Sequence, residues 1–399
     1  MNKNYDVAII GGGIVGSALA AHLANENLKV VVLKSENLGT PASIAAAGLL
    51  SPFQIDELEN PLLKDLCFKS FEYLPQFIEN ILSSPSNSNI DLGYRKSGSL
   101  FLLFSNFEFA KKENEIKEIK ELEPNVQFVN RVDIEKYEPL LTKEAIGAYH
   151  FPSEGYINNP KFLKSVWNSC MYNKVDFLNK KVTRLNMKAN VVESISLEDG
   201  ENIQSKTFVI ANGVWANTFL KDLFNLKEDI VSAIKGEIIQ LESTEEKIIN
   251  KVIFCSEGYI TPRPKTNNFE TSSILVGSTS ELIDIKTNKD PYSASINGLS
   301  SLLNLFKKLI PSHNNFHLSN KWSGLRPQTK DKLPAIGKIP GLENLFCSIG
   351  HYRNGILMSA FSGMILKDII LGNSMEYNIE PFKVDRFLEL KNKEPLFTR

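Results

Sequence analysis

A glycine pattern near the start of the sequence constrains the fold more than any other feature. In the stretch VAIIGGGIVGSALAAHLA, Gly11, Gly13 and Gly16 keep G-x-G-x-x-G spacing between a short apolar run, residues 7–10, and an alanine-rich segment with helical character. A second β-branched run, residues 30–33, follows this segment. Short continuous apolar runs indicate buried parallel strands, so the region predicts a β-α-β unit.

Each glycine has a physical task in such a unit. Gly11 allows the tight turn between strand and helix, Gly13 lets a pyrophosphate approach the backbone, and Gly16 brings helix and strand together. The helix N-terminus supplies N–H donors and the positive end of the helix dipole. In its β-α-β setting the pattern predicts dinucleotide binding rather than a simple turn, with Ile14 and Val15 also at the cofactor.

The second strand ends on an unusual residue for such a site. An acidic side chain normally accepts hydrogen bonds from the adenosine ribose at this point, but the sequence has Lys34. Lysine offers no acceptor, so the ribose contact is lost, made by Ser35 or taken over by Glu36. Two other interpretations stay open: Lys34 binds a 2′-phosphate, which would indicate NADP, or it points to solvent.

Size and composition limit the class of protein. The chain has 399 residues, of which 42% are hydrophobic and 23% charged, so it can build a packed core, and its length predicts two domains. Its 45 basic and 46 acidic residues nearly cancel, which leaves no basic field to hold nucleic acid or an anionic membrane. Any ligand must therefore be recognised locally.

Cysteine spacing and apolar runs bear on the compartment. Cys67, Cys170, Cys255 and Cys347 lie far apart, without the paired spacing of zinc or redox sites, and the histidines show no metal-like spacing. The start of the sequence lacks the apolar stretch of a signal peptide, and no apolar run of about 18 residues is evident. These features predict a cytoplasmic protein with no metal site and no membrane span.

The rest of the sequence adds helices and strands of a second kind. Helices are expected at residues 61–82, 108–122, 160–173, 295–310 and 355–371, the third with Asn159 as N-cap and Pro160 in its first turn. Short strands at 237–241, 259–261 and 274–276 suggest an antiparallel sheet. The sequence thus predicts an α/β (α+β) fold, with a Rossmann-like parallel sheet beside an antiparallel sheet.

A family resemblance begins at SIAAAGLLSP, residues 43–52. It continues in order through KKVTRL, FVIANGVWA, KGEIIQL, GYITPR, ILVGSTSE, WSGLRPQTKDKLPAIG and GHYRNGIL, which cover most of the chain. In these segments, and in the intervals between them, the chain resembles the flavoprotein family of D-amino-acid, sarcosine and glycine oxidases. It is most similar to the glycine oxidase branch, which serves thiamine biosynthesis.

The resemblance implies FAD as the cofactor. Small residues in the first segment would lie against the isoalloxazine ring, since a flat ring can press on backbone only where no side-chain bulk intervenes. Some sarcosine oxidases tether FAD to a cysteine after the segment that matches GLRP, but none occurs between residues 326 and 346, so non-covalent FAD is expected. Besides the residues of the glycine pattern, Lys34 and Ser35, the implied cofactor-binding residues are Ala42, Ser43, Ala46, Ala47, Gly48, Leu49, Val182, Gly213, Trp215, Gly350, His351, Tyr352, Arg353, Asn354, Gly355, Ile356 and Leu357.

The resemblance also implies a substrate site. Arg326, in GLRP, would bind the substrate carboxylate, because a guanidinium group matches it with two hydrogen bonds. Tyr259, in GYITPR, matches the family tyrosine whose hydroxyl assists the carboxylate, and Arg353 is the third predicted substrate-binding residue. No acid or base is predicted, because positioning over the flavin carries most of the catalysis. His351 stays open between a contact with the ring and a structural hydrogen bond.

The activity that the resemblance implies is oxidative deamination of glycine or of a related small amine such as sarcosine or D-alanine. Hydride passes to FAD, O₂ reoxidises it to give H₂O₂, and the imine hydrolyses to glyoxylate and ammonia or feeds thiazole assembly. Two alternatives remain: a dehydrogenase with another electron acceptor, and a nucleotide-binding protein that has lost catalysis. Because the family is often oligomeric, a homo-oligomer is a further expectation.

The same resemblance divides the chain into two domains. The FAD-binding domain is predicted from residues 1–82, 150–228 and 322–390, and the substrate domain from residues 83–149 and 229–321.

Overall fold

A parallel sheet forms one half of the molecule. The computed structural model describes residues 4–35, 41–54, 60–225, 228–243, 249–263, 272–288 and 290–389. In the first sheet the strand order is β18-β19-β11-β1-β2-β8, with β10 on β11 and β9 on β10, and its central pairings are parallel. The strands are β1 (Asn4–Ile10), β2 (Val30–Lys34), β8 (Asp176–Asn179), β9 (Val182–Lys188), β10 (Val191–Leu197), β11 (Asn202–Ile210), β18 (Ala335–Lys338) and β19 (Leu345–Ile349).

Helices cover this sheet because its strands are apolar on both faces. One face packs on α1 (Ile14–Ala24), α3 (Pro61–Leu82), α6 (Asn159–Tyr172) and α9 (Gly355–Leu371), and the other on α7 (Asn217–Phe224), with α10 (Arg386–Glu389) near the end of the described chain. Val7 and Ile9 of β1 point to the first face, whereas Ala8 and Ile10 point to the second. This alternation follows from the two-residue period of a strand.

An antiparallel sheet forms the other half. Its order is β16-β12-β15-β14-β13-β4-β6-β5, with β17 paired along β12, and among the pairs of its described strands only β13 and β4 run parallel. The strands are β4 (Ser99–Leu103), β5 (Gln127–Asn130), β6 (Gly147–Phe151), β12 (Val231–Ser243), β13 (Val252–Cys255), β14 (Gly258–Arg263), β15 (Ser272–Gly277), β16 (Glu281–Ile283) and β17 (Phe316–Thr329). The helices α4 (Asn106–Leu122), α5 (Arg131–Tyr137) and α8 (Ile296–Leu309) accompany it.

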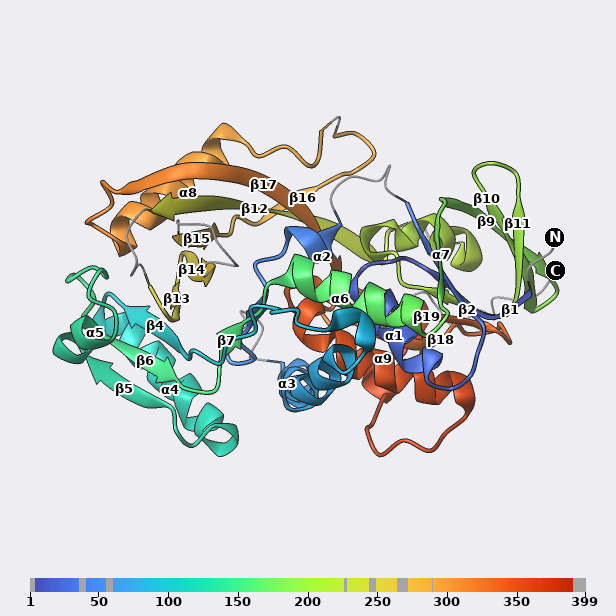
Figure 1. The fold of residues 1–399 in the computed structure, drawn as a ribbon, viewed down its shortest axis with the longest axis horizontal. Helices are drawn as coiled ribbons and strands as arrows, with labels where there is room; N and C mark the ends of the chain where they lie inside the picture. Colours follow the sequence, from blue (N-terminus) through green and yellow to red (C-terminus); the bar gives the residue numbers. More distant parts are fainter. Residues whose placement is uncertain are drawn as a thin grey trace.

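Short elements connect the two halves. They are α2 (Ala42–Ala45), the small sheet of β3 (Leu49–Leu50) with β7 (Gly155–Tyr156), and the 3₁₀ turns η2 (Pro85–Asn87), η3 (Gly213–Ala216), η4 (Tyr352–Asn354) and η5 (Glu380–Phe382). Figure 1 shows β12 and β17 side by side, reaching from the antiparallel half toward α2 at the middle of the molecule. The predicted fold class, a Rossmann-like parallel sheet with an antiparallel sheet, is confirmed.

Two strands cross the domain boundaries predicted from the sequence. β6 extends to Phe151 and β17 begins at Phe316, and each lies wholly within the antiparallel sheet. A strand cannot be cut between two sheets while its ladder of hydrogen bonds is continuous. We keep the two-domain division as a proposal, with both strands counted in the substrate domain.

One cap was predicted wrongly. Asn158, not Asn159, is the N-cap of α6, and its side-chain oxygen accepts a hydrogen bond from the Lys161 N–H at 3.2 Å. Asn159 is only 1% exposed, and its side chain donates to the carbonyl oxygens of Ser43 and Ile44 instead. A contact more than a hundred residues away in sequence thus overrides the local capping preference.

One helical stretch passes a length and hydropathy test for a membrane span, contrary to the expectation from the apolar runs of the sequence. It covers Tyr352–Leu371, and 56% of its apolar window is buried inside the fold. Residues of α9 such as Met358 and Ile365 belong to the main core. A buried core helix accounts for this stretch, so it is weak evidence for a membrane segment.

Candidate active site

A cavity of about 820 Å³ lies where the two sheets meet. The carboxyl ends of β1, β2 and β19 contribute Ile10, Lys34 and Ile349, and the antiparallel sheet contributes Tyr259 and Arg326. Ligands of open parallel sheets bind at this end of the strands. Except for Gly16 and Leu357, the lining includes every residue that was assigned to a cofactor or substrate from the sequence.

The glycine turn is built as its spacing predicts. Gly11 has a φ of +123°, and a Cβ atom there would come within 2.3 Å of the Ala211 carbonyl oxygen. A Cβ on Gly16 would lie 2.1 Å from the Gly11 oxygen, which explains why Gly16 joins helix to strand behind the cavity wall. A Cβ on Gly13 would meet only the Ser43 hydroxyl, at 3.2 Å, and otherwise open space, so a ligand can approach its backbone.

Lys34 lies along the cavity wall rather than pointing into solvent. Its ammonium nitrogen is 4.8 Å from the centre of the Trp167 ring, within the range of a cation–π contact. The neighbouring Ser35 hydroxyl is buried, has no hydrogen-bond partner among the described residues and lines the cavity, which fits the proposed ribose contact. The alternative partner, Glu36, lies outside the described residues.

Trp167 is a lining residue that the sequence motifs did not indicate. From α6 its indole N–H reaches the Gly12 carbonyl oxygen at 3.2 Å and the Ser17 hydroxyl at 2.9 Å, so it braces the glycine turn. No local motif marks it, because it stands about 150 residues from the turn. Only its position in the folded chain gives it this role.

The small-residue segment forms the wall between the two halves. Ala42, Ser43, Ala46, Ala47 and Leu49 all line the cavity together with Gly48. Gly48 has a φ of +70°, and a Cβ atom there would come within 2.0 Å of the Ile157 carbonyl oxygen. The Ser43 hydroxyl accepts a hydrogen bond from the Ile14 N–H at 2.9 Å, which fixes this segment against the first residue of α1.

Three further predicted contacts come from β9 and η3, which we call the rim of the cavity. Val182, at the start of β9, lines the cavity, as do Gly213 and Trp215 of η3. The oxygen of the Asn212 side chain is buried there, and no described residue hydrogen-bonds to it. This rim therefore offers backbone, an aromatic ring and an unused acceptor.

The segment GHYRNG joins β19 to α9. Gly350 has a φ of +76°, and a Cβ there would meet the Thr329 side chain at 2.3 Å. Gly355 and Ile356 bring the N-terminus of α9 to the cavity, and no side chain of a described residue caps that helix. Leu357 is 2% exposed, packs in the core and is not part of the lining, because one residue further along a helix points to another side; its assignment to the cofactor stays a prediction.

His351 is a buried, uncharged residue. It is 3% exposed, and its Nε2 atom lies 3.1 Å from the Ser362 hydroxyl of α9. Burial lowers the pKa of His351 to about 4, so the ring is neutral at physiological pH. The hydrogen bond favours the structural role, although the residue also lines the cavity.

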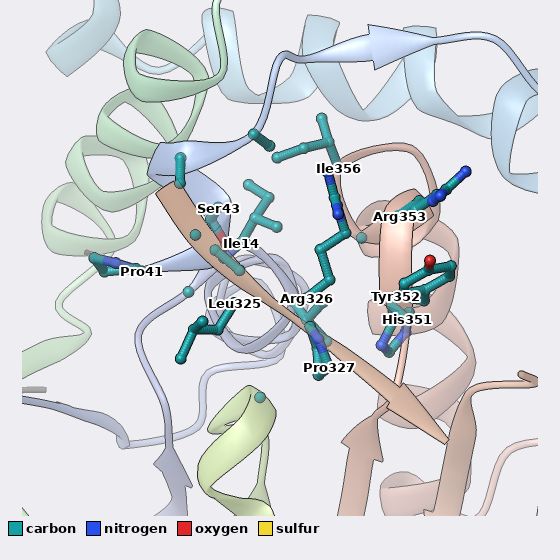
Figure 2. Close-up of a pocket in the computed structure, with 18 of the residues that line it drawn as sticks. Ile14, Pro41, Ser43, Leu325, Arg326, Pro327, His351, Tyr352, Arg353 and Ile356 are labelled. Atoms are coloured by element: carbon teal, nitrogen blue, oxygen red, sulfur yellow. The ribbon is translucent and has the colours of Figure 1, made fainter. Parts of the chain in front are cut away.

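Arg326 is held rigidly at the cavity. Its Nη2 atom donates to the Ser278 hydroxyl at 2.6 Å and its Nη1 atom to the Thr279 carbonyl oxygen at 3.1 Å. The guanidinium group lies flat on Gly236, where a Cβ atom would be 2.1 Å from Nη2. Figure 2 shows the side chain extending from β17 into the open space of the site. A fixed guanidinium with donors to spare is suited to bind a carboxylate.

Tyr259 stands beside Arg326. A Cβ atom on Gly277 would lie 2.4 Å from its hydroxyl oxygen, so the glycine makes room for the phenol. Burial raises the pKa of Tyr259, although the Arg326 charge and a hydrogen bond with Ser278 oppose the rise. The hydroxyl is therefore protonated at neutral pH and can donate a hydrogen bond.

Arg353 differs from Arg326. It is exposed, and its guanidinium carbon lies 5.1 Å from the centre of the Tyr352 ring. Figure 2 shows it pointing away from Arg326, although it belongs to the lining. Its predicted role in substrate binding stays a proposal.

The polar groups of the cavity fit a dinucleotide. At the lining, buried side-chain nitrogen or oxygen atoms find no partner in the part of the chain that the structure describes; they belong to Ser35, Gln54, Asn212 and Ser348. Buried polar atoms are normally satisfied, so such a group calls for a polar ligand. The open backbone at Gly13 and the N-termini of α1 and α9 suit phosphate and an electron-rich ring. No cluster of possible metal ligands occurs among the described residues.

Comparison with known proteins agrees with this geometry. A family model described as FAD dependent oxidoreductase, DAO, matches residues 6–369. Glycine oxidase of Geobacillus kaustophilus is 27% identical over 396 residues, which cover 97% of this chain and 98% of that protein. The crystal structure of glycine oxidase from Geobacillus kaustophilus has a TM-score of 0.85 at 26% identity and covers 96% of this chain and 99% of its own.

A longer relative also matches. The Bifunctional protein ThiO/ThiG of Trichormus variabilis is 28% identical over 397 residues, which cover 98% of this chain but 57% of that protein. The chain thus spans a little more than half the length of this relative.

Proposed function

The chain belongs to the family of FAD-dependent oxidoreductases, and we propose that it catalyses oxidative deamination of glycine or of a closely related small amine such as sarcosine or D-alanine. For glycine the balanced reaction consumes one O₂ and one water and gives glyoxylate, ammonia and H₂O₂. The cofactor is FAD, which we expect to be bound non-covalently. The glycine oxidase relatives and the Arg326 site support the proposal.

The geometry of Arg326 carries this proposal. The guanidinium group is fixed by Ser278, Thr279 and the flat contact with Gly236, so it presents its remaining N–H groups in one orientation. A substrate carboxylate bound there can also accept a hydrogen bond from the protonated hydroxyl of Tyr259. Binding by two fixed groups orients the α-carbon and lowers the entropic part of the barrier.

When bound, FAD supplies the two-electron acceptor for the α-hydrogen and its electrons. The chain's own residues bind the carboxylate, orient the amine and exclude water. Apolar and aromatic side chains, Leu49, Ile238 and Phe254, line the cavity near Tyr259, and their packing limits the space for water. His351 is neutral, so its ring adds no charge that would repel the amine.

The fate of the imine is a further part of the proposal. The sequence resemblance implies that the imine feeds thiazole assembly. The relative described as a bifunctional ThiO/ThiG protein supports this proposal, because the part of it that matches this chain is joined to a second part. From the same family resemblance we propose O₂ as the electron acceptor, with another oxidant as the alternative.

An anaerobic titration tests the proposal. The purified protein is expected to carry FAD, and glycine should bleach the long-wavelength flavin absorbance without oxygen. Sarcosine and D-alanine follow as separate titrations, and L-alanine serves as the control of opposite chirality. A flavin that no small amine bleaches would contradict the proposed activity while leaving the family intact.

Mixing the reduced protein with oxygen tests the acceptor. Fast reoxidation with formation of H₂O₂ supports an oxidase. Slow reoxidation by O₂ combined with fast reoxidation by a soluble quinone would identify a dehydrogenase instead.

A further inference from the structure

Two strands of the antiparallel sheet carry both the substrate clamp and the contacts to the small-residue wall. β14 bears Tyr259 and, four residues later, Arg263; β17 bears Trp322 and, four residues later, Arg326. Residues an even number apart on a strand share a face. Each strand therefore presents one residue to the substrate and one to the segment 43–48, which forms the wall predicted to contact the ring.

Side chains from distant elements satisfy the carbonyl groups of that segment. Asn159 donates from Nδ2 to the oxygens of Ser43, at 2.6 Å, and Ile44, at 3.0 Å. The Trp322 indole donates to the oxygen of Ala45 at 2.9 Å. Arg263 donates from Nη2 to the oxygen of Ala47.

Asn159 and Arg263 also meet each other. The Arg263 Nη2 atom lies 3.3 Å from the side-chain oxygen of Asn159, so helix α6 and strand β14 hold the segment jointly. Trp322 packs in the same small apolar cluster as Ala47 and Tyr259. The position of the wall is thus tied to the strands that fix the substrate.

Arg263 has an electrostatic feature that a simple brace does not need. Within the described part of the chain, its buried Nη1 atom has no hydrogen-bond partner and no carboxylate forms an ion pair with it. Burial lowers the pKa of Arg263 to about 10, which still leaves it charged at neutral pH. An unpaired buried cation costs free energy, and a neutral residue could hold the same carbonyl groups at a smaller cost.

We propose that Arg263 is a positioning residue. Together with Asn159 and Trp322 it fixes the position of the segment 43–48 relative to the substrate clamp, and its charge stabilises negative charge on the side of the cavity where the flavin ring is expected. The effect on charge follows from the position of Arg263, because its Nη2 atom contacts the carbonyl oxygen of Ala47, which lines the cavity. The inference rests on bound FAD and on the clamp of the proposed function.

The test compares Arg263→Met with Arg263→Lys. Met keeps the length and removes the charge, whereas Lys keeps the charge and loses the second donor. The midpoint potential of bound FAD is measured by chemical reduction, without any amine substrate. We expect a lower potential in the Met variant and a potential close to that of the unmodified protein in the Lys variant.

A second measurement reports the position of the segment 43–48 relative to the substrate clamp. Acetate, a carboxylate that cannot be oxidised as an amine, is titrated into each variant while the visible flavin spectrum is recorded. We expect the spectral change to differ in both variants, and reduction by saturating glycine to slow about tenfold in Arg263→Met, as for loss of one hydrogen bond to a charged group.

Asn87→Ala is the matched control. Asn87 is 1% exposed and donates to the oxygens of Ile81 and Ser165, at 2.8 and 2.9 Å, but it does not line the cavity. This variant should lose stability while its flavin potential and spectrum stay unchanged. If Arg263→Met behaves in the same way, Arg263 is only a structural brace and the proposal is wrong.

Trp322→Phe decides the case in which Arg263→Met does not bind FAD. It removes the indole donor to Ala45 and keeps an aromatic ring in the cluster. A shifted flavin spectrum with a changed acetate titration supports the proposal, and an unchanged spectrum with an unchanged titration overturns it. Since neither reading needs amine oxidation, failure of glycine as substrate leaves this test valid.

Discussion

The glycine turn and the substrate clamp are built in opposite ways. The turn offers backbone: Gly11, Gly13 and Gly16 lie within six consecutive residues and act because they lack side chains. The clamp offers side chains: Tyr259 and Arg326 come from strands far apart in sequence and act through atoms at their tips. A site made of closely packed backbone tolerates no added atom at its crowded glycines, Gly11 and Gly16, whereas a site made of side chains tolerates changes that keep the fold.

The largest effect is expected at Gly16. In Gly16→Val the new side chain would overlap the Gly11 oxygen, which is 2.1 Å from the Cβ position, so helix and strand must separate. We expect loss of bound FAD and a destabilisation of at least about 3 kcal/mol, the upper range for overpacking. Flavin content and thermal unfolding measure both.

Gly355→Ala is the control for Gly16. A Cβ atom at Gly355 meets nothing closer than 3.7 Å, although the residue lines the same cavity. It should fold normally and retain more FAD than Gly16→Val. Equal damage in the two variants would show that the contrast between crowded and open glycines is wrong.

Arg326→Ala should separate substrate binding from cofactor binding. Without the guanidinium group the carboxylate loses its fixed partner, and we expect kcat/KM for glycine to fall about 10²- to 10³-fold, as for a truncated buried charge pair. The flavin content should not change, because Arg326 is held by Ser278 and Thr279, which connect β15 to β16 in the antiparallel half.

Arg326→Lys and Arg353→Ala sharpen this result. Lys keeps the charge without the two-pronged geometry and should recover only part of the loss. Arg353 is exposed and points away, so its removal should cost less than removal of Arg326. The opposite order would identify Arg353 as the main clamp.

His351 lines the same cavity and predicts a pH effect. Its folded pKa of about 4 is below the usual 6.5, so the unfolded chain takes up the proton first as the pH falls. The associated stability is present above pH 6.5 and is lost progressively toward pH 4, by about 3 kcal/mol in total. His351→Gln can still bond to Ser362 and does not titrate.

The measurement for His351 is chemical denaturation at several pH values. Since His22, His150 and Glu154 also have shifted pKa values, the quantity to follow is the difference between the unmodified protein and His351→Gln. A difference that stays constant from pH 6.5 to 4 would contradict a buried neutral histidine.

Lys34→Met should have the smallest effect. It removes the charge above Trp167 but leaves the backbone of the glycine turn intact, so we expect FAD affinity to change only about fivefold or less, the value of one cation–π contact. Fluorescence titration of the apoprotein with FAD measures it. A loss of binding as large as in Gly16→Val would mean that a side chain, not the backbone, dominates this region.

Much of the fold followed from short-range patterns. The glycine spacing, the apolar runs around it and the helix at residues 61–82 needed only local periodicity, and the structure has them where they were expected. The failures share a cause. Asn159 was misassigned as a cap and Trp167 was missed because both act on segments more than a hundred residues away, which no local preference records.

The sequence by itself determined a dinucleotide-binding β-α-β unit and, through its resemblance, the family and the identity of Arg326 and Tyr259 as candidates. Only the tertiary structure decided which atoms meet. It tied Arg263 and Trp322 to the wall of the cavity, bonded His351 to Ser362 and turned Arg326 onto Gly236. The physical reason is that backbone features are encoded at adjacent positions, whereas the orientation of a buried charge depends on every element packed around it.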